Sequence, residues 1–251
     1  MSQSLTGDPQ IKQAQRLLAS EYAEQRSQEW LDLRDNMITA SDIASAIGEN
    51  HYETPDAFVK KKVLRTKWAG NAATAHGTLL EPMVRDLYDA RTGRKSHEIG
   101  LVIHRDYPWL GASPDGVTED GILIEIKCPL TRKIEPKVPK HYLPQVQLQL
   151  EVTDLEECDF IQYRPGDPEE FVITRVTRDR AWFAQHLPAM KASWERVRNG
   201  REHGLCEMLD EPEFKDEIVC EIVDDDAVHP QEQNPHVPGV CEPVLCQVHS
   251  T

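Results

Sequence analysis

The chain has 251 residues, of which 39% are hydrophobic and 28% are charged, and its formal net charge is −15. No apolar run approaches the roughly eighteen residues that a membrane span needs, so the composition predicts a soluble globular protein without a membrane partner. A net negative charge argues against a nucleic-acid ligand. However, residues 205–251 hold twelve Asp and Glu against one Lys, whereas the first 204 residues carry a net charge of only −4. A local basic groove in the body of the protein is therefore still possible.

The cysteines and the first residues of the chain help to predict the cellular compartment. The six cysteines are scattered and form no C-x-x-C pair, which predicts free thiols in a reducing, intracellular setting. The opening MSQSLTGDPQIKQ has no basic head followed by an apolar stretch, so we expect no secretory signal.

Helices are predicted in the first part of the chain, where apolar residues recur at helical spacing between capping residues. The predicted helices are Pro9–Gln25, a short helix that Thr39 or Ser41 caps and that ends near Gly48, a helix with Thr54 as its cap and Pro55 at its first position, and Ala72–Arg91, which Gly93 closes.

Strand-like runs rich in Val, Ile and aromatic residues follow. They are Glu98–His104, Leu110–Ser113, Ile122–Ile126, Asp159–Tyr163 and Phe171–Val176, with a helix Pro144–Glu151 inside the series and a last amphipathic helix that stops at Gly200. This order predicts an α/β or α+β core, in which a mixed sheet of about five strands is flanked by helices. We expect residues 1–204 to form this domain and residues 205–251 to form an acidic, flexible tail.

The strand 122–126 carries charged side chains at its end. The sequence reads SPDGVTEDGILIEIKCP from Ser113 to Pro129. Because successive strand residues point to opposite faces, Glu125 and Lys127 share one face of the strand. Asp115 lies ten residues before Glu125, in a Pro-Asp-Gly turn.

These side chains can support metal-assisted attack on a phosphodiester. Asp115 and Glu125, with the carbonyl group of Ile126, can hold Mg²⁺, which takes one or two carboxylates together with waters and phosphate oxygens. Lys127 can then orient the attacking water, help to deprotonate it, or stabilise charge on the phosphate. The alternative is an exposed cross-strand pair beside an ordinary turn, and an isolated E-x-K tripeptide would favour that alternative.

Further motifs decide between the two interpretations. LRDNMITASDIA, HGTLLEPMVRDLY, GASPDG, EIKCP and YLPQVQLQL occur in this order. Together they resemble the lambda-exonuclease-like (YqaJ-type) viral recombinases, or alkaline exonucleases, of the PD-(D/E)-x-K nuclease superfamily. The resemblance extends over about Trp30 to Arg198 and implies a PD-(D/E)XK, restriction-endonuclease-like core.

The resemblance implies a role for each matching residue. It makes Asp115 and Glu125 metal ligands and Lys127 the catalytic lysine. It places Glu81 at the metal site, where a solvated helix carboxylate would otherwise be the simpler interpretation. It places Gln145 near the water or the phosphate. Gln147 and Gln149 follow at intervals of two, and one helix cannot point all three glutamines the same way.

A second set of residues matches the family's 5′-phosphate pocket. The resemblance assigns Arg34, Ser41 and Ser113 to it, and a guanidinium with two hydroxyls suits a phosphate dianion. Ser41 at a helix start would favour an anion or simply cap the helix. The basic stretch KKKVLRTKW (residues 60–68) and Lys133 can contact the DNA backbone.

The function implied by the resemblance is a Mg²⁺-dependent exonuclease, with Mn²⁺ as a substitute. It would digest duplex DNA ends from 5′ to 3′ and leave 3′ single-stranded tails for recombination by strand annealing. The implied partners are double-stranded DNA ends, a single-strand annealing protein and two further copies in a trimer. A phage or prophage gene would place the protein in a bacterial cytoplasm.

Two other functions are considered. A Cas4-like or RecB-like nuclease, or a site-specific endonuclease, would use the same core. Cys206, Cys220, Cys241 and Cys246 could then offer iron–sulfur ligands, although their spacing is loose. A DNA-end-binding module without catalysis would have no need of Asp115, Glu125 and Lys127 together.

Overall fold

The structure is a computed structural model that describes residues 7–66 and 72–204. The helices in these ranges are α1 (Pro9–Ala19), α2 (Gln28–Asp35), α3 (Ile43–Ala46), α4 (Pro55–Leu64), α5 (Ala72–Thr92), α6 (Leu143–Thr153) and α7 (Arg180–His203), with 3₁₀ turns η2 (Ala40–Asp42) and η3 (Lys140–Tyr142). The strands are β1 (Ile38–Thr39), β2 (Ser96–His97), β3 (Val102–Ile103), β4 (Leu110–Ala112), β5 (Gly116–Thr118), β6 (Ile122–Lys127), β7 (Glu157–Arg164) and β8 (Glu170–Thr177).

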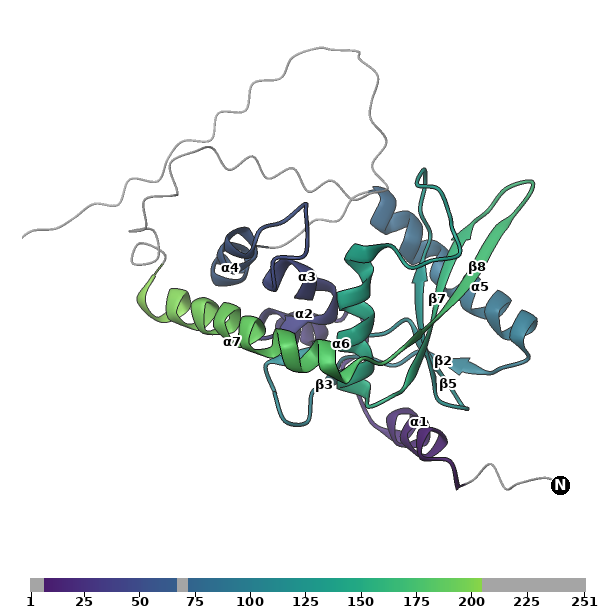
Figure 1. The fold of residues 1–251 in the computed structure, drawn as a ribbon, viewed down its shortest axis with the longest axis horizontal. Helices are drawn as coiled ribbons and strands as arrows, with labels where there is room; N and C mark the ends of the chain where they lie inside the picture. Colours follow the sequence, from purple (N-terminus) through teal and green to yellow (C-terminus); the bar gives the residue numbers. More distant parts are fainter. Residues whose placement is uncertain (1–6, 67–71, 205–251) are drawn as a thin grey trace, which may run out of the picture.

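The larger sheet has five strands in the order β2-β5-β6-β7-β8. β6 and β7 are parallel, and the other neighbours are antiparallel. Helix α5 lies on one face of this sheet and α6 on the other (Figure 1). The predicted mixed sheet of about five strands between helices is confirmed. None of the described helices combines the length and the hydrophobicity that a bilayer crossing requires.

The membership of the sheets differs from the strand prediction. The predicted strand Glu98–His104 is wrong as one element, because β2 ends at His97 and β3 begins at Val102. β3 and β4 join β1 in a separate three-stranded sheet. The missed strand β5 begins at Gly116, where the sequence predicts only a turn. It is three residues long, so it offers too little alternation to be recognised.

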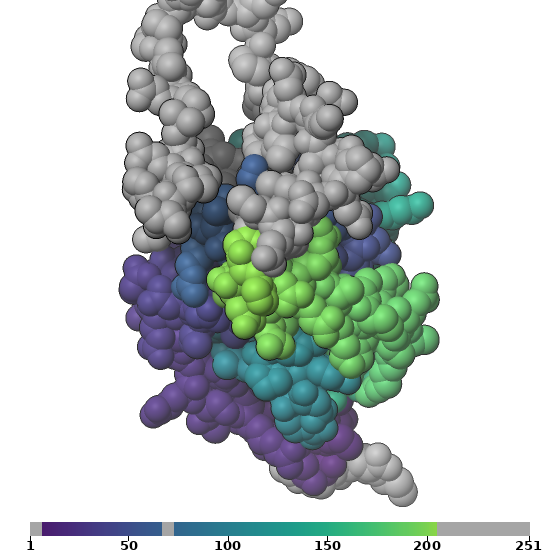
Figure 2. Space-filling model, turned by 90° about the vertical axis from the view of Figure 1, so that its left-hand side faces the viewer, coloured from purple at the N-terminus to yellow at the C-terminus, as the bar shows by residue number. Residues whose placement is uncertain are grey.

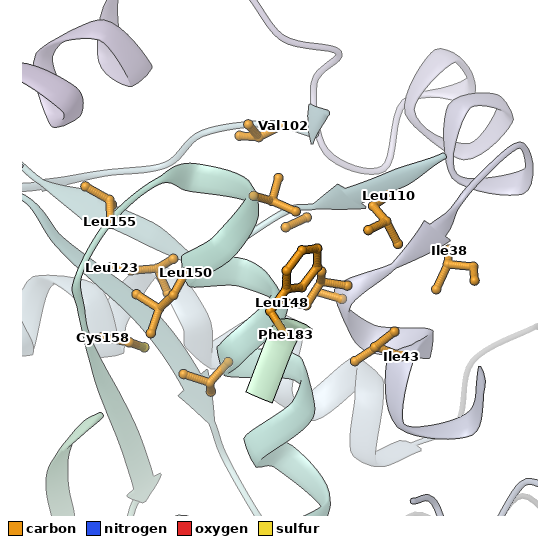
Figure 3. Close-up of a cluster of buried hydrophobic side chains, with 14 of the residues drawn as sticks. Ile38, Ile43, Val102, Leu110, Leu123, Leu148, Leu150, Leu155, Cys158 and Phe183 are labelled. Carbon is orange, nitrogen blue, oxygen red and sulfur yellow. The ribbon is translucent and has the colours of Figure 1, made fainter. Parts of the chain in front are cut away.

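Helix α6 is the centre of the main core. Leu148 and Leu150 of this helix are fully buried, and they pack with Leu123 of β6 on one side and Ile43 of α3 on another (Figure 3). Helix α7 covers this core from outside: Phe183 reaches the cluster (Figure 3), while the helix itself lies on the molecular surface (Figure 2). Most residues of α6 are buried, so its apolar side chains are not confined to one face of the helix.

Two helix ends differ from the prediction, and one helix was not predicted. α1 stops at Ala19, because Ser20 is extended, and not at Gln25. Ser27 caps the unpredicted helix α2, since its side chain accepts a hydrogen bond from the Trp30 amide. α7 continues past Gly200 to His203, since a buried glycine inside a packed helix does not have to end it. The proposed tail, residues 205–251, lies outside the described residues.

The extended segment between α1 and α2 packs closely on Gly100. A Cβ atom at Gly100 would overlap the carbonyl oxygen of Ala23 and lie 2.6 Å from the Cβ atom of Tyr22. Because these are backbone or backbone-linked atoms, no side-chain rotation can relieve the overlap. Gly100 therefore allows this segment to lie against the sheet.

We predict that Gly100→Ala lowers the free energy of unfolding by about 1–3 kcal/mol through overpacking. Gly77→Ala is the control, because its new Cβ atom would meet nothing within 4 Å inside α5. That control should raise stability by about 0.5–1 kcal/mol. Urea unfolding measures both. Equal free energies of unfolding for Gly100→Ala and Gly77→Ala would contradict the close packing of Tyr22 and Ala23 on Gly100.

Candidate functional site

The alternation of β6 separates its charged and apolar side chains. Ile124 and Ile126 pack in the cluster beneath α5, whereas Leu123 packs in the cluster around α6. Glu125 and Lys127 share the face of Leu123 and so point toward α6. Glu125 is only 2% exposed. The alternative of an exposed cross-strand pair is therefore wrong.

The buried carboxyl group of Glu125 has three donors around it. Its Oε1 accepts hydrogen bonds from Gln145 Nε2 at 2.6 Å and lies 2.7 Å from Lys127 Nζ. Its Oε2 accepts from Gln149 Nε2 at 2.6 Å. A buried carboxylate needs such donors, because an unpaired charge in the interior is costly.

Gln149 is a site residue that the sequence reasoning missed. Gln145 and Gln149 are four residues apart on α6, so they lie on one face of the helix and reach the two oxygens of the same carboxylate. Gln147 points elsewhere: its amide donates to the Thr177 carbonyl and accepts from the Asp179 amide. The i, i+4 spacing was the available signal for Gln149.

Asp115 lies at the start of β5, beside the end of β6. Its Oδ2 accepts a hydrogen bond of 2.6 Å from the Ile126 amide, and Arg85 donates to its carbonyl oxygen. Burial raises the pKa of Asp115 well above its ordinary value, and Glu125 and Glu81 raise it further against the opposing charge of Lys127. Asp115 thus interacts electrostatically with two further carboxyl groups, and carboxylate oxygens suit a hard cation.

Backbone geometry adds one candidate ligand. The N–H and C=O groups of a strand residue point toward the same neighbouring strand. Since the Ile126 amide faces Asp115, its carbonyl faces the same side, beyond the end of β5. Within residues 7–66 and 72–204, no three His, Cys, Asp or Glu side chains are arranged to hold a metal ion. Asp115, Glu125 and the Ile126 carbonyl are instead the sparse oxygen set that fits Mg²⁺.

Glu81 on α5 completes the acidic group, and Arg26 holds it. The two side chains form an ion pair of 2.9 Å. Burial raises the pKa of Glu81, and Glu98 and Glu125 add to this while Arg26 opposes it. Arg26 has a φ of 69°, a left-handed conformation that a residue with a side chain rarely adopts. The solvated-carboxylate interpretation of Glu81 does not fit this placement.

Lys127 is held as a cation. Burial alone would lower its pKa, but Glu125, Tyr142 and Asp115 outweigh burial and raise the pKa well above its ordinary value. Its Nζ atom lies 4.8 Å from the centre of the Tyr142 ring. In this arrangement Lys127 is an ammonium group that donates hydrogen bonds and stabilises negative charge.

The three residues of the predicted phosphate pocket are brought together by a tryptophan. Arg34 Nη2 donates to Ser41 Oγ at 2.9 Å, and its guanidinium lies 4.2 Å from the centre of the Trp30 ring. Trp30 Nε1 in turn donates to Ser113 Oγ at 2.9 Å. Ser113 lies two residues before Asp115, so the pocket adjoins the carboxylates.

Neither Thr39 nor Ser41 caps a helix as expected. The segment forms the 3₁₀ turn η2 and then the four-residue helix α3, without a side-chain cap at either start. A helix this short gives no anion site of its own. The hydroxyl of Ser41 is instead bonded to Arg34 and Thr39.

The other predicted DNA contacts are lysines, and several of them have acidic partners. Lys133 is 82% exposed and lies 3.4 Å from Glu135. Lys61 and Lys62 pair with acidic side chains, and Lys62 is buried. The end of the basic stretch, residues 67–68, lies outside the described residues, as do Cys206, Cys220, Cys241 and Cys246.

A cavity of about 140 Å³ lies beside both groups of predicted site residues. Ser41 of the phosphate pocket and Gln145, which bonds to Glu125, line it together with Ala40, Ala44, Asn50, Tyr52, His141 and Tyr142. The cavity thus touches one member of each group. Its lining of aromatic rings, amides and hydroxyls suits a small polar ligand with a flat ring.

Comparison with solved structures places this fold among alkaline exonucleases. The alkaline exonuclease LHK-Exo from Laribacter hongkongensis is 30% identical, with a TM-score of 0.63, and the match covers 72% of this chain and 98% of that one. LHK-Exo in complex with dAMP is 29% identical over the same shares, with a TM-score of 0.61.

Residues 29–156 match the YqaJ-like viral recombinase domain, and the chain belongs to this family. Among relatives, the uncharacterized protein R354 of Acanthamoeba polyphaga mimivirus is 33% identical over 55% of this chain and 29% of its own length. Protein D345L of African swine fever virus is 31% identical over 52% of this chain and 46% of its own. The chain thus spans less than half of these viral proteins.

The crowding of carboxylates gives a stability prediction. Because the pKa of Asp115 is raised on folding, its ionised form costs stability, increasingly as the pH rises through that pKa. In protein free of divalent cations, we expect Asp115→Asn to raise the unfolding free energy by about 1 kcal/mol at pH 8 and by less at pH 5. Asn keeps an oxygen for the Ile126 amide.

Asp106→Asn is the control, since Asp106 is exposed and lies outside the carboxylate group. Thermal unfolding in EDTA at both pH values measures the effect. A loss of stability in Asp115→Asn, or the same gain in the control, would contradict this account.

Proposed function

We propose that this protein is a Mg²⁺-dependent exonuclease that digests duplex DNA from a 5′-phosphorylated end and leaves a 3′ single-stranded tail. The observation that carries the proposal is that one cavity adjoins both groups of candidate site residues. Ser41, which bonds to Arg34, and Gln145, which bonds to Glu125 beside Lys127, both line this cavity. The family and the likeness to LHK-Exo support the same reaction.

The residues present fit a hard cation. Asp115, Glu125 and the Ile126 carbonyl would hold Mg²⁺, which when bound supplies a more acidic water and stabilises charge on the phosphate. Lys127 would donate to the water or to a phosphate oxygen. Gln145 and Gln149 fix the orientation of Glu125, and Glu81 adds negative charge from the opposite face.

The phosphate pocket supports exonucleolytic cleavage over internal cleavage. If Arg34, Ser41 and Ser113 bind a terminal phosphate, the first nucleotide would occupy the cavity and its 3′ phosphodiester would reach Glu125 and Lys127. Only a chain end carries a terminal phosphate, so binding there would select ends. A ring-lined cavity suits the sugar and base of one nucleotide.

The partners and the assembly are further parts of the proposal. A single-strand annealing protein, a trimer and a bacterial host follow from the resemblance, and relatives in viruses of eukaryotes leave the host open. No contact among the described residues favours a Cas4-like or site-specific endonuclease. A module that only binds DNA ends would not require Lys127 to be paired with Glu125.

We predict that Lys127→Met reduces exonuclease activity by about 10²–10⁴-fold, because the charge that supports the attacking water is lost. Lys95→Met is the matched control and should keep most of the activity, since Lys95 is exposed, pairs with Glu119 and lies at the opposite end of β5 from Asp115. Release of labelled nucleotides from a duplex with Mg²⁺ measures both. Activity of Lys127→Met within a few-fold of the unmodified protein would contradict the role of Lys127.

We also predict that Arg34→Met reduces the preference for a 5′-phosphate over a 5′-hydroxyl end by about tenfold or more, the worth of a charge-assisted hydrogen bond. Arg105→Met is the control, because Arg105 is exposed on the β3–β4 loop. The ratio of kcat/KM on the two duplexes measures this. An unchanged ratio in Arg34→Met would exclude Arg34 from phosphate binding.

A further inference from the structure

A buried ion pair lies behind the proposed phosphate pocket. Asp42 Oδ2 lies 2.8 Å from Lys62 Nζ, and Asp42 Oδ1 lies 3.6 Å from Lys61 Nζ. The same Oδ2 accepts a hydrogen bond of 2.8 Å from Thr39 Oγ1. Lys62 is 7% exposed and Thr39 is fully buried. Neither residue is accessible to DNA, so both can act only through their neighbours.

The charge state of Asp42 fixes the direction of its hydrogen bonds. Burial by itself would raise the pKa of Asp42, but Lys62, Lys61 and Arg34 outweigh burial and hold the pKa well below its ordinary value. Asp42 is therefore ionised and can only accept. The single proton of Thr39 Oγ1 is committed to it.

The same donor-to-acceptor direction includes Ser41 of the phosphate pocket. Thr39 Oγ1 lies 3.0 Å from Ser41 Oγ. Because the only O–H of Thr39 donates its hydrogen bond to Asp42, Ser41 is the donor in this contact. Ser41 in turn accepts from Arg34. A one-way series thus runs from Arg34 through Ser41 and Thr39 to Asp42, and it fixes the position of the Ser41 hydroxyl beside the Arg34 guanidinium.

Lys62 also holds the backbone of Arg34, the other residue of the proposed phosphate contact. Its Nζ atom donates to the Arg34 carbonyl oxygen at 2.9 Å, at the end of α2. Arg201 of α7 supports the same place, since it donates to the carbonyl oxygens of Asp35 and Lys62. One buried ammonium group therefore ties the backbone of Arg34 to the carboxylate that orients Thr39 and Ser41.

We propose that Asp42, Thr39 and Lys62 are positioning residues that set the preference of this enzyme for a phosphorylated DNA end. The inference rests on the proposed function, because it takes the Arg34–Ser41 pair to be the phosphate contact. The buried unit holds the Arg34 guanidinium of α2 and the Ser41 hydroxyl of η2 in a fixed position relative to each other. Without the unit, both groups must be ordered when the DNA binds.

The test is Thr39→Val, which keeps the shape of the side chain and removes only the hydroxyl. We expect the ratio of kcat/KM on 5′-phosphate and 5′-hydroxyl duplexes to fall about fivefold, the worth of one neutral hydrogen bond. Turnover at saturating DNA should stay within twofold. Thr174→Val is the matched control, because the buried Thr174 hydroxyl has no hydrogen-bond partner and lies on β8.

Asp42→Asn should lower the same ratio further and also lower the melting temperature, because it leaves Lys62 buried without its counter-charge. An unchanged ratio in folded Thr39→Val, with the unmodified protein still preferring the phosphate, would overturn the inference and leave the proposed function standing. An unmodified protein that does not distinguish the two ends would overturn the phosphate pocket itself, and the inference with it.

Discussion

The burial of the Glu125 carboxylate is the constraint on which the rest of the site depends. A carboxyl group that is 2% exposed needs hydrogen-bond partners, and Gln145, Gln149 and Lys127 provide them. Two of these donors come from α6 and one from β6. The requirement therefore fixes the rotation of α6 over the sheet, and the same helix carries the leucines of the main core.

The fold brings the phosphate pocket to this carboxylate through the small sheet. β1 pairs with β4 in parallel, with Thr39 opposite Gly111, so the turn after β1 and the chain after β4 leave the sheet together. Ser41 follows the first strand and Ser113 follows the second. Residues more than seventy positions apart in the sequence thus contribute to one pocket, and Trp30 from α2 joins them.

Much of the site could be predicted from the sequence, for identifiable reasons. The alternation of β6 separates Glu125 and Lys127 from Ile124 and Ile126 without further information. Five motifs in order indicated the family, which placed Glu81 and the phosphate residues. Gln149 was missed because one glutamine had been assigned by resemblance, although its spacing from Gln145 was readable.

Other features were beyond sequence reasoning. The strands β2, β3 and β5 have two or three residues each, which is too few for a pattern. Pairing with neighbours far along the chain creates them. The ion pair of Lys62 with Asp42 could not be predicted either, because a run of lysines is typical of a solvated face. Only the packing of α4 shows that one of these lysines is buried.

The measurement that tests the central claim most directly is the identity and polarity of the products. A blunt duplex with a 5′-phosphate is labelled at the 5′ end in one sample and at the 3′ end of the same strand in the other, and both are digested with Mg²⁺. The account predicts that the 5′ label leaves first, as a mononucleotide, while the 3′ label stays in a shortening fragment. Early release of the 3′ label, or internal fragments of fixed length, would contradict it.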